Sequence, residues 1–337
     1  MKKAFSCFLI LSLLIISIVF PAAVWAEEEA NDTDSKPAQT QEQEKTTEKE
    51  NAAETKDDSK NESTSKKKAT NNNRNYNRSY NYYSQSANNV DGVISIIFTH
   101  DMYSHIDASG SKKTGGAAKM VTAFKEISRS FTEDTYVLDA GNFTGDTILN
   151  CIFDTDAPEI RLMGYMGFDA TTLGANEYIF GEEKLIDMLK AAKKSGEDIP
   201  SVLIGNASEK GFKGTGAKTG FKVLEKNSTK IAVFAIADEK TADGYSDPVS
   251  YAKEQIKKIK KKKDIDLVVC LSESSNGTFA EELADEVSGI DLIIAAGTGN
   301  KLKSPEKKGK TLIVSSGKNS KNIGHITFKE NDKGKYK

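Results

Sequence analysis

From about residue 92 onward, short apolar runs of strand length alternate with stretches of helical periodicity. The first run, residues 93–98, is almost continuously apolar, as in a strand that is covered on both faces. Residues 117–129 follow, with apolar side chains at three- and four-residue spacing, which is typical of an amphipathic helix. Strand–helix alternation in this order predicts an α/β fold with open or packed sheets.

The alternation continues to residue 328, and the later elements are predicted from the same two periodicities. Helices are expected over 158–167, 182–194, 247–263 and 279–287, and strands over 136–138, 169–172, 201–204, 267–271, 291–295, 311–314 and 323–328. Residues 221–224 and 231–236 are expected to form a hairpin. Ligands of α/β proteins bind at the carboxyl ends of strands, so the loops that follow these strands are the candidate site.

The amino terminus carries a targeting signal. A basic start, an apolar run from Phe8 to Val19 and small residues ending at Ala26 predict a secretory signal peptide over 1–26. An uncleaved anchor is less favoured because three glutamates follow at once. No other stretch approaches the roughly 20 apolar residues of a membrane span. We therefore expect a secreted or cell-surface bacterial protein with no transmembrane helix in the mature chain.

Residues 27–89 contain no Val, Leu, Ile, Met, Phe, Trp or Cys. Such a segment buries too little apolar surface to offset its chain entropy, which predicts a disordered polar linker over 27–90. Its end, residues 71–83, is rich in Asn, Tyr and Arg. We favour a spacer, and the alternative is a segment that binds a wall polymer or glycan. The ordered domain is expected over 91–329, with a frayed polar end over 330–337.

The charge and the cysteine content limit the classes of partner and of disulfide-bonded fold that are expected. The net charge of −2 is weak and mixed, so no nucleic-acid polymer is expected as a partner. Cys151 and Cys270 are too few for a disulfide framework, although a single bridge between them stays open. The lysine-rich run 257–263 lies at the end of a predicted helix. It is expected to be a solvated face favoured by the helix dipole, with contact to an anionic wall polymer as the alternative.

Five linked stretches carry a resemblance, and they are residues 98–102, 114–119, 137–143, 166–174 and 289–294. In order and spacing they resemble the amino-terminal metallophosphoesterase (calcineurin-like) domain of the secreted 5'-nucleotidase and 2',3'-cyclic phosphodiesterase family. The resemblance covers about residues 93–328. It implies a β-sandwich flanked by helices. It also implies a site where two bridged divalent metals clamp a phosphoryl group and supply a hydroxide nucleophile. Family members usually continue into a domain that holds the nucleoside base, which we do not expect here, since the chain stops at Lys337.

The resemblance also implies where the metal ligands should stand, and most are replaced. The first block should read Asp-x-His. Asp101 is present, but Tyr103 replaces the His, and a phenol ligates only when it is deprotonated. Asn142 replaces the bridging Asp. Its neutral amide cannot balance two cations.

The remaining blocks show the same loss. In the Gly-Asn-His-Glu block, Ala175 replaces the ligand Asn, and Asn176 replaces the His that protonates the leaving group. Glu273 replaces a ligand His, and Gly297 and Gly299 remove both imidazoles of the last block. We therefore expect no retained catalytic residue. The degenerate pocket comprises Asp101, Tyr103, Asn142, Ala175, Asn176, Glu273, Gly297 and Gly299.

Three hypotheses follow. The first is a catalytically degenerate module without a cofactor, which binds an unknown surface or cell-wall ligand or acts as a scaffold. The second is an active metal-dependent phosphoesterase or nucleotidase. In that case Asp101, Asn142 and Glu273 would hold one divalent Mn, Mg or Ca ion in the degenerate pocket, because oxygen ligands favour hard cations. His100 would assist as a displaced ligand or acid–base group, although we favour a hydrogen-bonded loop residue. The third is an adhesin acting through the linker.

Overall fold

The computed structural model describes residues 92–108, 110, 113–131, 134–237 and 245–337. The predicted signal peptide over 1–26 and the predicted linker over 27–90 lie outside the described residues. None of the helices in the described ranges has the length and apolar character that crossing a membrane requires.

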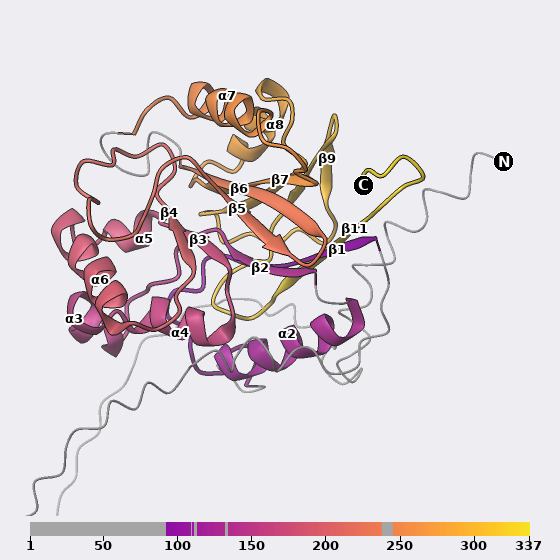
Figure 1. The fold of residues 1–337 in the computed structure, drawn as a ribbon. Helices are drawn as coiled ribbons and strands as arrows, with labels where there is room; N and C mark the ends of the chain where they lie inside the picture. The colour runs from indigo at the N-terminus through magenta and orange to yellow at the C-terminus, as the bar shows by residue number, and fades with distance from the viewer. Residues whose placement is uncertain (1–91, 109, 111–112, 132–133, 238–244) are drawn as a thin grey trace, which may run out of the picture. The chain divides into compact units, whose positions relative to one another are not determined.

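The first of two sheets has five strands in the order β11-β1-β2-β3-β4 (Figure 1). The strands are β1 (Val93–Thr99), β2 (Thr135–Asp139), β3 (Ala170–Thr172), β4 (Ser201–Leu203) and β11 (Gly324–Lys329). Strands β1 to β4 pair in parallel, and β11 runs antiparallel to β1 at one edge. Parallel pairing needs crossover connections, which the intervening helices supply.

The second sheet has six strands in the order β5-β6-β7-β8-β10-β9. They are β5 (Phe221–Lys226), β6 (Thr229–Ala237), β7 (Leu267–Glu273), β8 (Leu292–Ala296), β9 (Glu306–Lys308) and β10 (Thr311–Val314). The four central strands pair in parallel, and β5 and β9 are antiparallel edges. The predicted hairpin is confirmed as β5 and β6.

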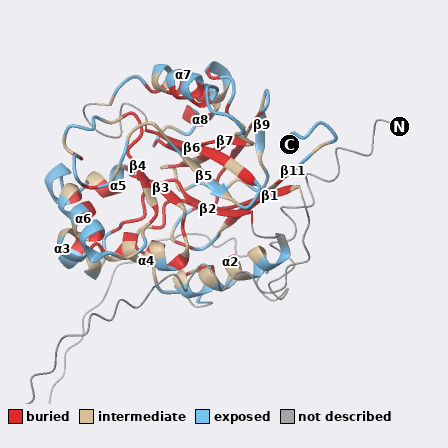
Figure 2. Cartoon of the chain, viewed as in Figure 1, coloured by how far each residue is buried: buried red, intermediate tan, exposed pale blue. Residues whose placement is uncertain are grey.

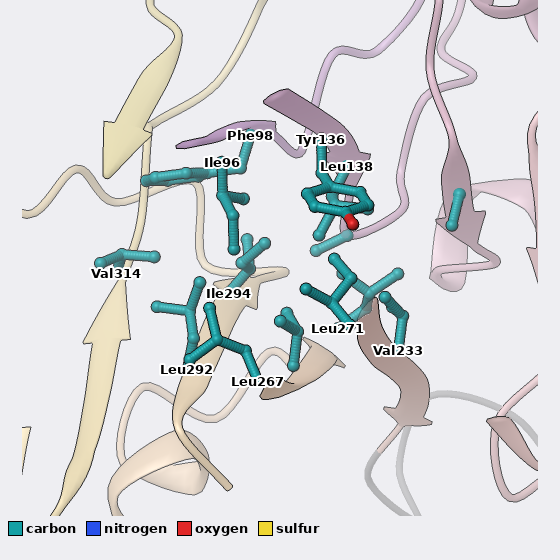
Figure 3. Close-up of a cluster of buried hydrophobic side chains, with 14 of the residues drawn as sticks. Ile96, Phe98, Tyr136, Leu138, Val233, Leu267, Leu271, Leu292, Ile294 and Val314 are labelled. Atoms are coloured by element: carbon teal, nitrogen blue, oxygen red, sulfur yellow. The ribbon is translucent and has the colours of Figure 1, made fainter. Parts of the chain in front are cut away.

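The two sheets pack face to face over one apolar cluster. Figure 3 shows side chains of the first sheet facing those of the second: Ile96, Phe98, Tyr136 and Leu138 against Val233, Leu271 and Ile294. Tyr136 is fully buried, and its hydroxyl donates to the backbone oxygen of Thr229 at 2.9 Å. This bond satisfies the one polar atom that the ring brings between the sheets.

Helices cover the outer face of each sheet. Helices α2 (Ala117–Phe131), α4 (Pro158–Met166) and α6 (Glu182–Ser195) pack on the first sheet, and α7 (Pro248–Ile259) and α8 (Phe279–Glu286) pack on the second. In Figure 2 the strands are mostly buried, while the helices are exposed on their outer sides. The predicted α/β sandwich flanked by helices is confirmed.

In three places the structure adds to the sequence analysis or differs from it. Helix α7 ends at Ile259, not near residue 263. Residues 330–337 are not frayed, because Lys329 and Lys337 exchange backbone hydrogen bonds of 2.9 and 3.0 Å and fold the end back as a turn. Cys151 and Cys270 are both free, the first exposed and the second buried, so no bridge joins them.

Four short elements were not predicted: η3 (Ile148–Ile152), α3 (Phe153–Asp156), α5 (Ala175–Tyr178) and β9. Each has three to five residues. Such lengths are too short for an apolar periodicity to develop, and β9 is wholly charged.

Candidate functional site

Loops from both sheets meet at the carboxyl ends of the strands. Strands β1 and β2 end level, with Thr99 opposite Asp139, and β7 and β8 end level, with Glu273 opposite Ala296. The loop after β1 is bound to the loop after β2 by backbone bonds from Asp101 to Gly141 and from Tyr103 to Asn142. The strand ends therefore bring the predicted pocket residues from five separate segments to one edge.

The carboxylate of Asp101 is fully buried and is surrounded by hydrogen-bond donors. Oδ1 accepts from the Asn142 side-chain amide at 2.8 Å and from the Gly297 backbone at 3.2 Å. Oδ2 accepts from His100 Nδ1 at 3.0 Å and from the Gly297 and Gly299 backbones at 3.1 and 3.0 Å. Burial alone would raise the pKa of Asp101, but the bonds from His100, Asn142 and Gly297 outweigh it and lower the pKa. Asp101 is thus a buried anion held by N–H groups.

The side-chain amide of Asn142 lies between two carboxylates. Its Nδ2 donates to Asp101 Oδ1 at 2.8 Å and to Glu273 Oε1 at 3.2 Å. Its Oδ1 accepts from the Asn176 backbone N–H at 3.0 Å. The hydrogen bonds at the nitrogen and those at the oxygen therefore assign the same orientation of the amide, with the nitrogen facing the carboxylates.

His100 is buried in the same network. Its Nε2 lies 2.7 Å from the Ser316 backbone nitrogen and 3.2 Å from that of Gly317. Backbone N–H groups only donate, so Nε2 is the acceptor and Nδ1 carries the proton that it donates to Asp101. This geometry is that of a hydrogen-bonded loop residue, and both ring nitrogens are engaged.

Glycine occupies two positions of the pocket with positive φ, and at Gly297 the backbone of Ser274 leaves no room for a side chain. Gly297 has a φ of 94°, and a Cβ there would lie 2.3 Å from the backbone oxygen of Ser274. Gly299 has a φ of 68°, and a Cβ there would lie 2.9 Å from the side chain of Lys318. An imidazole at position 297 would therefore require the backbone to move.

Glu177 is a site residue that sequence reasoning missed. It is fully buried, and its two oxygens accept from the backbones of Asn142, Gly174 and Thr144 and from the Thr144 hydroxyl, at 2.7 to 3.0 Å. Burial raises the pKa of Glu177 to about 8, against the hydrogen bonds that favour its anion. The available signal was the last position of the Gly-Asn-His-Glu block, which Glu177 retains three positions after Gly174, at the start of α5.

The other predicted positions lie around this centre. Tyr103 is half-buried, and burial together with the charges of Asp101 and Glu273 raises the pKa of its phenol, which stays protonated. Ala175 is exposed. The Asn176 side chain donates to the Thr144 backbone oxygen at 3.1 Å, so its amide nitrogen points to the loop after β2.

The donor chemistry of the pocket can be compared with what two cations would require. Metal ligands must offer lone pairs, but here an amide N–H2 and the backbone N–H groups of Gly297 and Gly299 face the carboxylate of Asp101. Within the described ranges, no group of three or more His, Cys, Asp or Glu side chains is arranged to hold a metal ion. These residues do not fit a two-metal centre.

Comparison with proteins of known structure assigns the fold. The 5'-nucleotidase precursor from Thermus thermophilus superposes with a TM-score of 0.62 at 19% identity, over 73% of this chain and 53% of that one. The calcineurin-like phosphoesterase YfkN from Bacillus subtilis superposes with a TM-score of 0.56 at 17% identity, over 73% of this chain and 88% of that one. The fold is that of the calcineurin-like phosphoesterases.

Sequence comparison agrees with this calcineurin-like fold. The trifunctional nucleotide phosphoesterase YfkN of Bacillus subtilis (strain 168) is 24% identical over 282 residues. That match covers 72% of this chain and 18% of YfkN, so this chain spans under a fifth of that relative's length. No family model matches the chain. The chain is therefore similar, in sequence and in structure, to the 5'-nucleotidase and calcineurin-like phosphoesterase family.

Proposed function

We propose that this chain is a catalytically degenerate 5'-nucleotidase-like module, used for binding or scaffolding at the cell surface and not for phosphoester hydrolysis. The observation that carries the proposal is the position of Asn142 Nδ2, which donates to both Asp101 and Glu273. In a two-metal site that position belongs to lone pairs aimed at cations. Here N–H groups balance the carboxylates instead.

The surrounding bonds support the same conclusion. Binding a cation at Asp101 would require displacing the backbone N–H groups of Gly297 and Gly299, which both donate to its Oδ2. Those donors belong to a loop in which both glycines have positive φ values and Gly297 lies against the backbone of Ser274. Rearranging that loop would cost several charge-assisted hydrogen bonds, each contributing about 1.5–3 kcal/mol.

Placement at the cell surface rests on the predicted signal peptide over 1–26. The nucleotide phosphoesterase and 5'-nucleotidase activities named for the relatives would need a nucleophile and a leaving-group acid. Asn176, in the place of that acid, is neutral and directs its amide nitrogen to the Thr144 backbone. The position of the leaving-group acid is therefore occupied by a side chain that cannot supply a proton in that role.

One observation favours a second candidate, a phosphoesterase with a single hard cation. Asp101 and Glu273 both reach one amide nitrogen, at 2.8 and 3.2 Å. A flip of the Asn142 amide would direct three oxygens at that point, a set suited to Mg²⁺, Mn²⁺ or Ca²⁺. The flip would turn the amide nitrogen toward the Asn176 N–H, so two donors would then face each other.

The test uses the mature chain from residue 27, purified without chelator and with the linker intact. Metal content is measured, and nucleotides and bis(p-nitrophenyl) phosphate are assayed with Mn²⁺, Zn²⁺, Mg²⁺ and Ca²⁺. We expect substoichiometric metal and no metal-dependent turnover. Turnover that is lost in Asp101→Ala would overturn the proposal and establish the single-cation alternative.

A further inference from the structure

A second hollow lies away from the degenerate pocket, between α7 and the end of α8. It is a groove of about 320 Å³, lined by Lys253, Ile256, Lys257, Lys260, Glu286, Val287 and Ser288. Figure 1 shows α7 and α8 side by side on the outer face of the second sheet. Three of the seven lining side chains are lysines at four- and three-residue spacing along α7 and its end, so they share one face.

The floor of the groove is apolar and buried. Ile256 and Val287 are 4% and 1% exposed and belong to the core that joins these helices to the second sheet. Gly289 brings the backbone close: a Cβ there would lie 3.1 Å from Ile256 and 3.7 Å from Lys260 Nζ. The Lys260 stem therefore lies over the floor, with its ammonium group at the rim.

The rim carries more positive than negative charge, with three lysines against Glu286. Lys253 forms only a long, exposed ion pair with Glu286, at 3.9 Å, which stabilises little. Lys257 and Lys260 are exposed and form no ion pair with another described residue. The exposed lysines 261–263 extend the array beyond the groove. The chain as a whole has a net charge of −2, so this patch is a local feature and not a general surplus.

We propose that this groove binds a phosphodiester polymer that carries one negative charge per repeat and no bases. A row of ammonium groups suits a run of phosphates, because lysine binds phosphate as a point charge without a fixed approach geometry. The lining contains no aromatic or arginine side chain, and single-stranded nucleic acids are usually held by stacking on such groups. The site is independent of the degenerate pocket and would hold the protein at a surface rich in such a polymer.

The experiment measures binding of soluble poly(glycerol phosphate) to the mature chain by titration calorimetry at several salt concentrations. The double variant Lys257→Gln/Lys260→Gln is compared with Lys210→Gln/Lys213→Gln. The second variant removes the same charge from two exposed lysines in a loop outside the groove. We expect binding that weakens with salt, an affinity loss of about 10- to 30-fold in the first variant and less than about 3-fold in the second. All four side chains are exposed, so thermal unfolding should change little, with a small decrease in the first variant because Lys257 and Lys260 stand at the end of α7.

Two results would overturn the proposal. Equal losses in both variants would show a diffuse charge effect without a groove. Binding of a single-stranded oligonucleotide as tightly as poly(glycerol phosphate), with the same dependence on Lys257 and Lys260, would contradict the assignment to a polymer without bases.

Discussion

The side-chain nitrogen of Asn142 lies 2.8 Å from Oδ1 of Asp101, so an amide proton fills the space where the resemblance implies a bridging carboxylate and its cations. The same nitrogen donates to Glu273 across the two sheets. One neutral side chain thus bridges two acidic side chains through a single amide nitrogen. From this relationship we expect the stability of the pocket to depend on the neutrality of the side chain at position 142.

Replacing Asn142 with Asp tests that dependence. Asn142→Asp places a third carboxylate beside two others, and we expect a loss of about 3 kcal/mol at pH 7. Repulsion raises the pKa of the new group, so the loss should shrink as the pH falls and protonates it. Asn300→Asp, the same change at an exposed position, should cost under about 0.5 kcal/mol. Urea denaturation at pH 5 and pH 7 provides the measurement.

Mn²⁺ should change the melting temperature of Asn142→Asp but not that of the wild type. A carboxylate at position 142 supplies an oxygen to a cation, so Mn²⁺ should raise the melting temperature of Asn142→Asp through preferential binding to the folded state. The wild type should respond neither to Mn²⁺ nor to EDTA. A wild-type melting temperature that rises with Mn²⁺ as far as that of the variant would instead support the single-cation candidate.

Gly297 should be intolerant of any side chain. Its φ of 94° is strained for other residues, and a Cβ would lie 2.3 Å from the Ser274 backbone oxygen. Gly214 is a matched control, with a φ of 89° and no atom within 4 Å of the same built Cβ. We expect Gly214→Ala to cost about 1–2 kcal/mol from backbone strain, and Gly297→Ala at least about 2 kcal/mol more. Equal losses in chemical denaturation would show that the Ser274 contact relaxes freely.

Glu177 should be needed to hold together the loops after β2 and β3 at the degenerate pocket. In Glu177→Gln, the amide N–H2 must face the backbone donors of Gly174 and Asn142 or that of Thr144. We expect a loss of about 2–3 kcal/mol at pH 9, above the pKa of about 8 at which Glu177 becomes an anion that only accepts, because the amide then places a donor against other donors. Glu183→Gln, exposed at the first turn of α6, serves as the control and should be near neutral. Hydrogen exchange should also quicken at the Thr144 and Gly174 amides, and unchanged rates there would count against this role.

Some of this arrangement could be predicted from the chain and some could not. Parallel strands that end level bring the residues after them to one edge, which is why Asp101 and Asn142 could be expected to lie together. The direction of the Asn142 amide could not be predicted, because it depends on a backbone N–H of Asn176 and on Glu273, 131 residues away. The tautomer of His100 likewise depends on the loop after β10. Periodicity identifies elements of several turns or alternations, whereas bonds between distant loops leave no periodic trace.

His325 should make stability depend on pH below neutrality. It lies in β11, is 2% exposed, and contacts the Ser95 hydroxyl at 3.0 Å through Nε2. Burial lowers its pKa from 6.5 to about 4, so the unfolded chain binds the proton more tightly than the folded one. Its contribution to stability is then fully present above about pH 6.5, is lost as the pH falls toward 4, and is constant below that. The loss is on the order of 3 kcal/mol. His325→Gln keeps a hydrogen-bonding group without the titration, so the difference in unfolding free energy between wild type and variant should change between pH 7 and pH 4. A difference that stays constant over that interval would show that the imidazole binds its proton equally tightly in the folded and the unfolded chain.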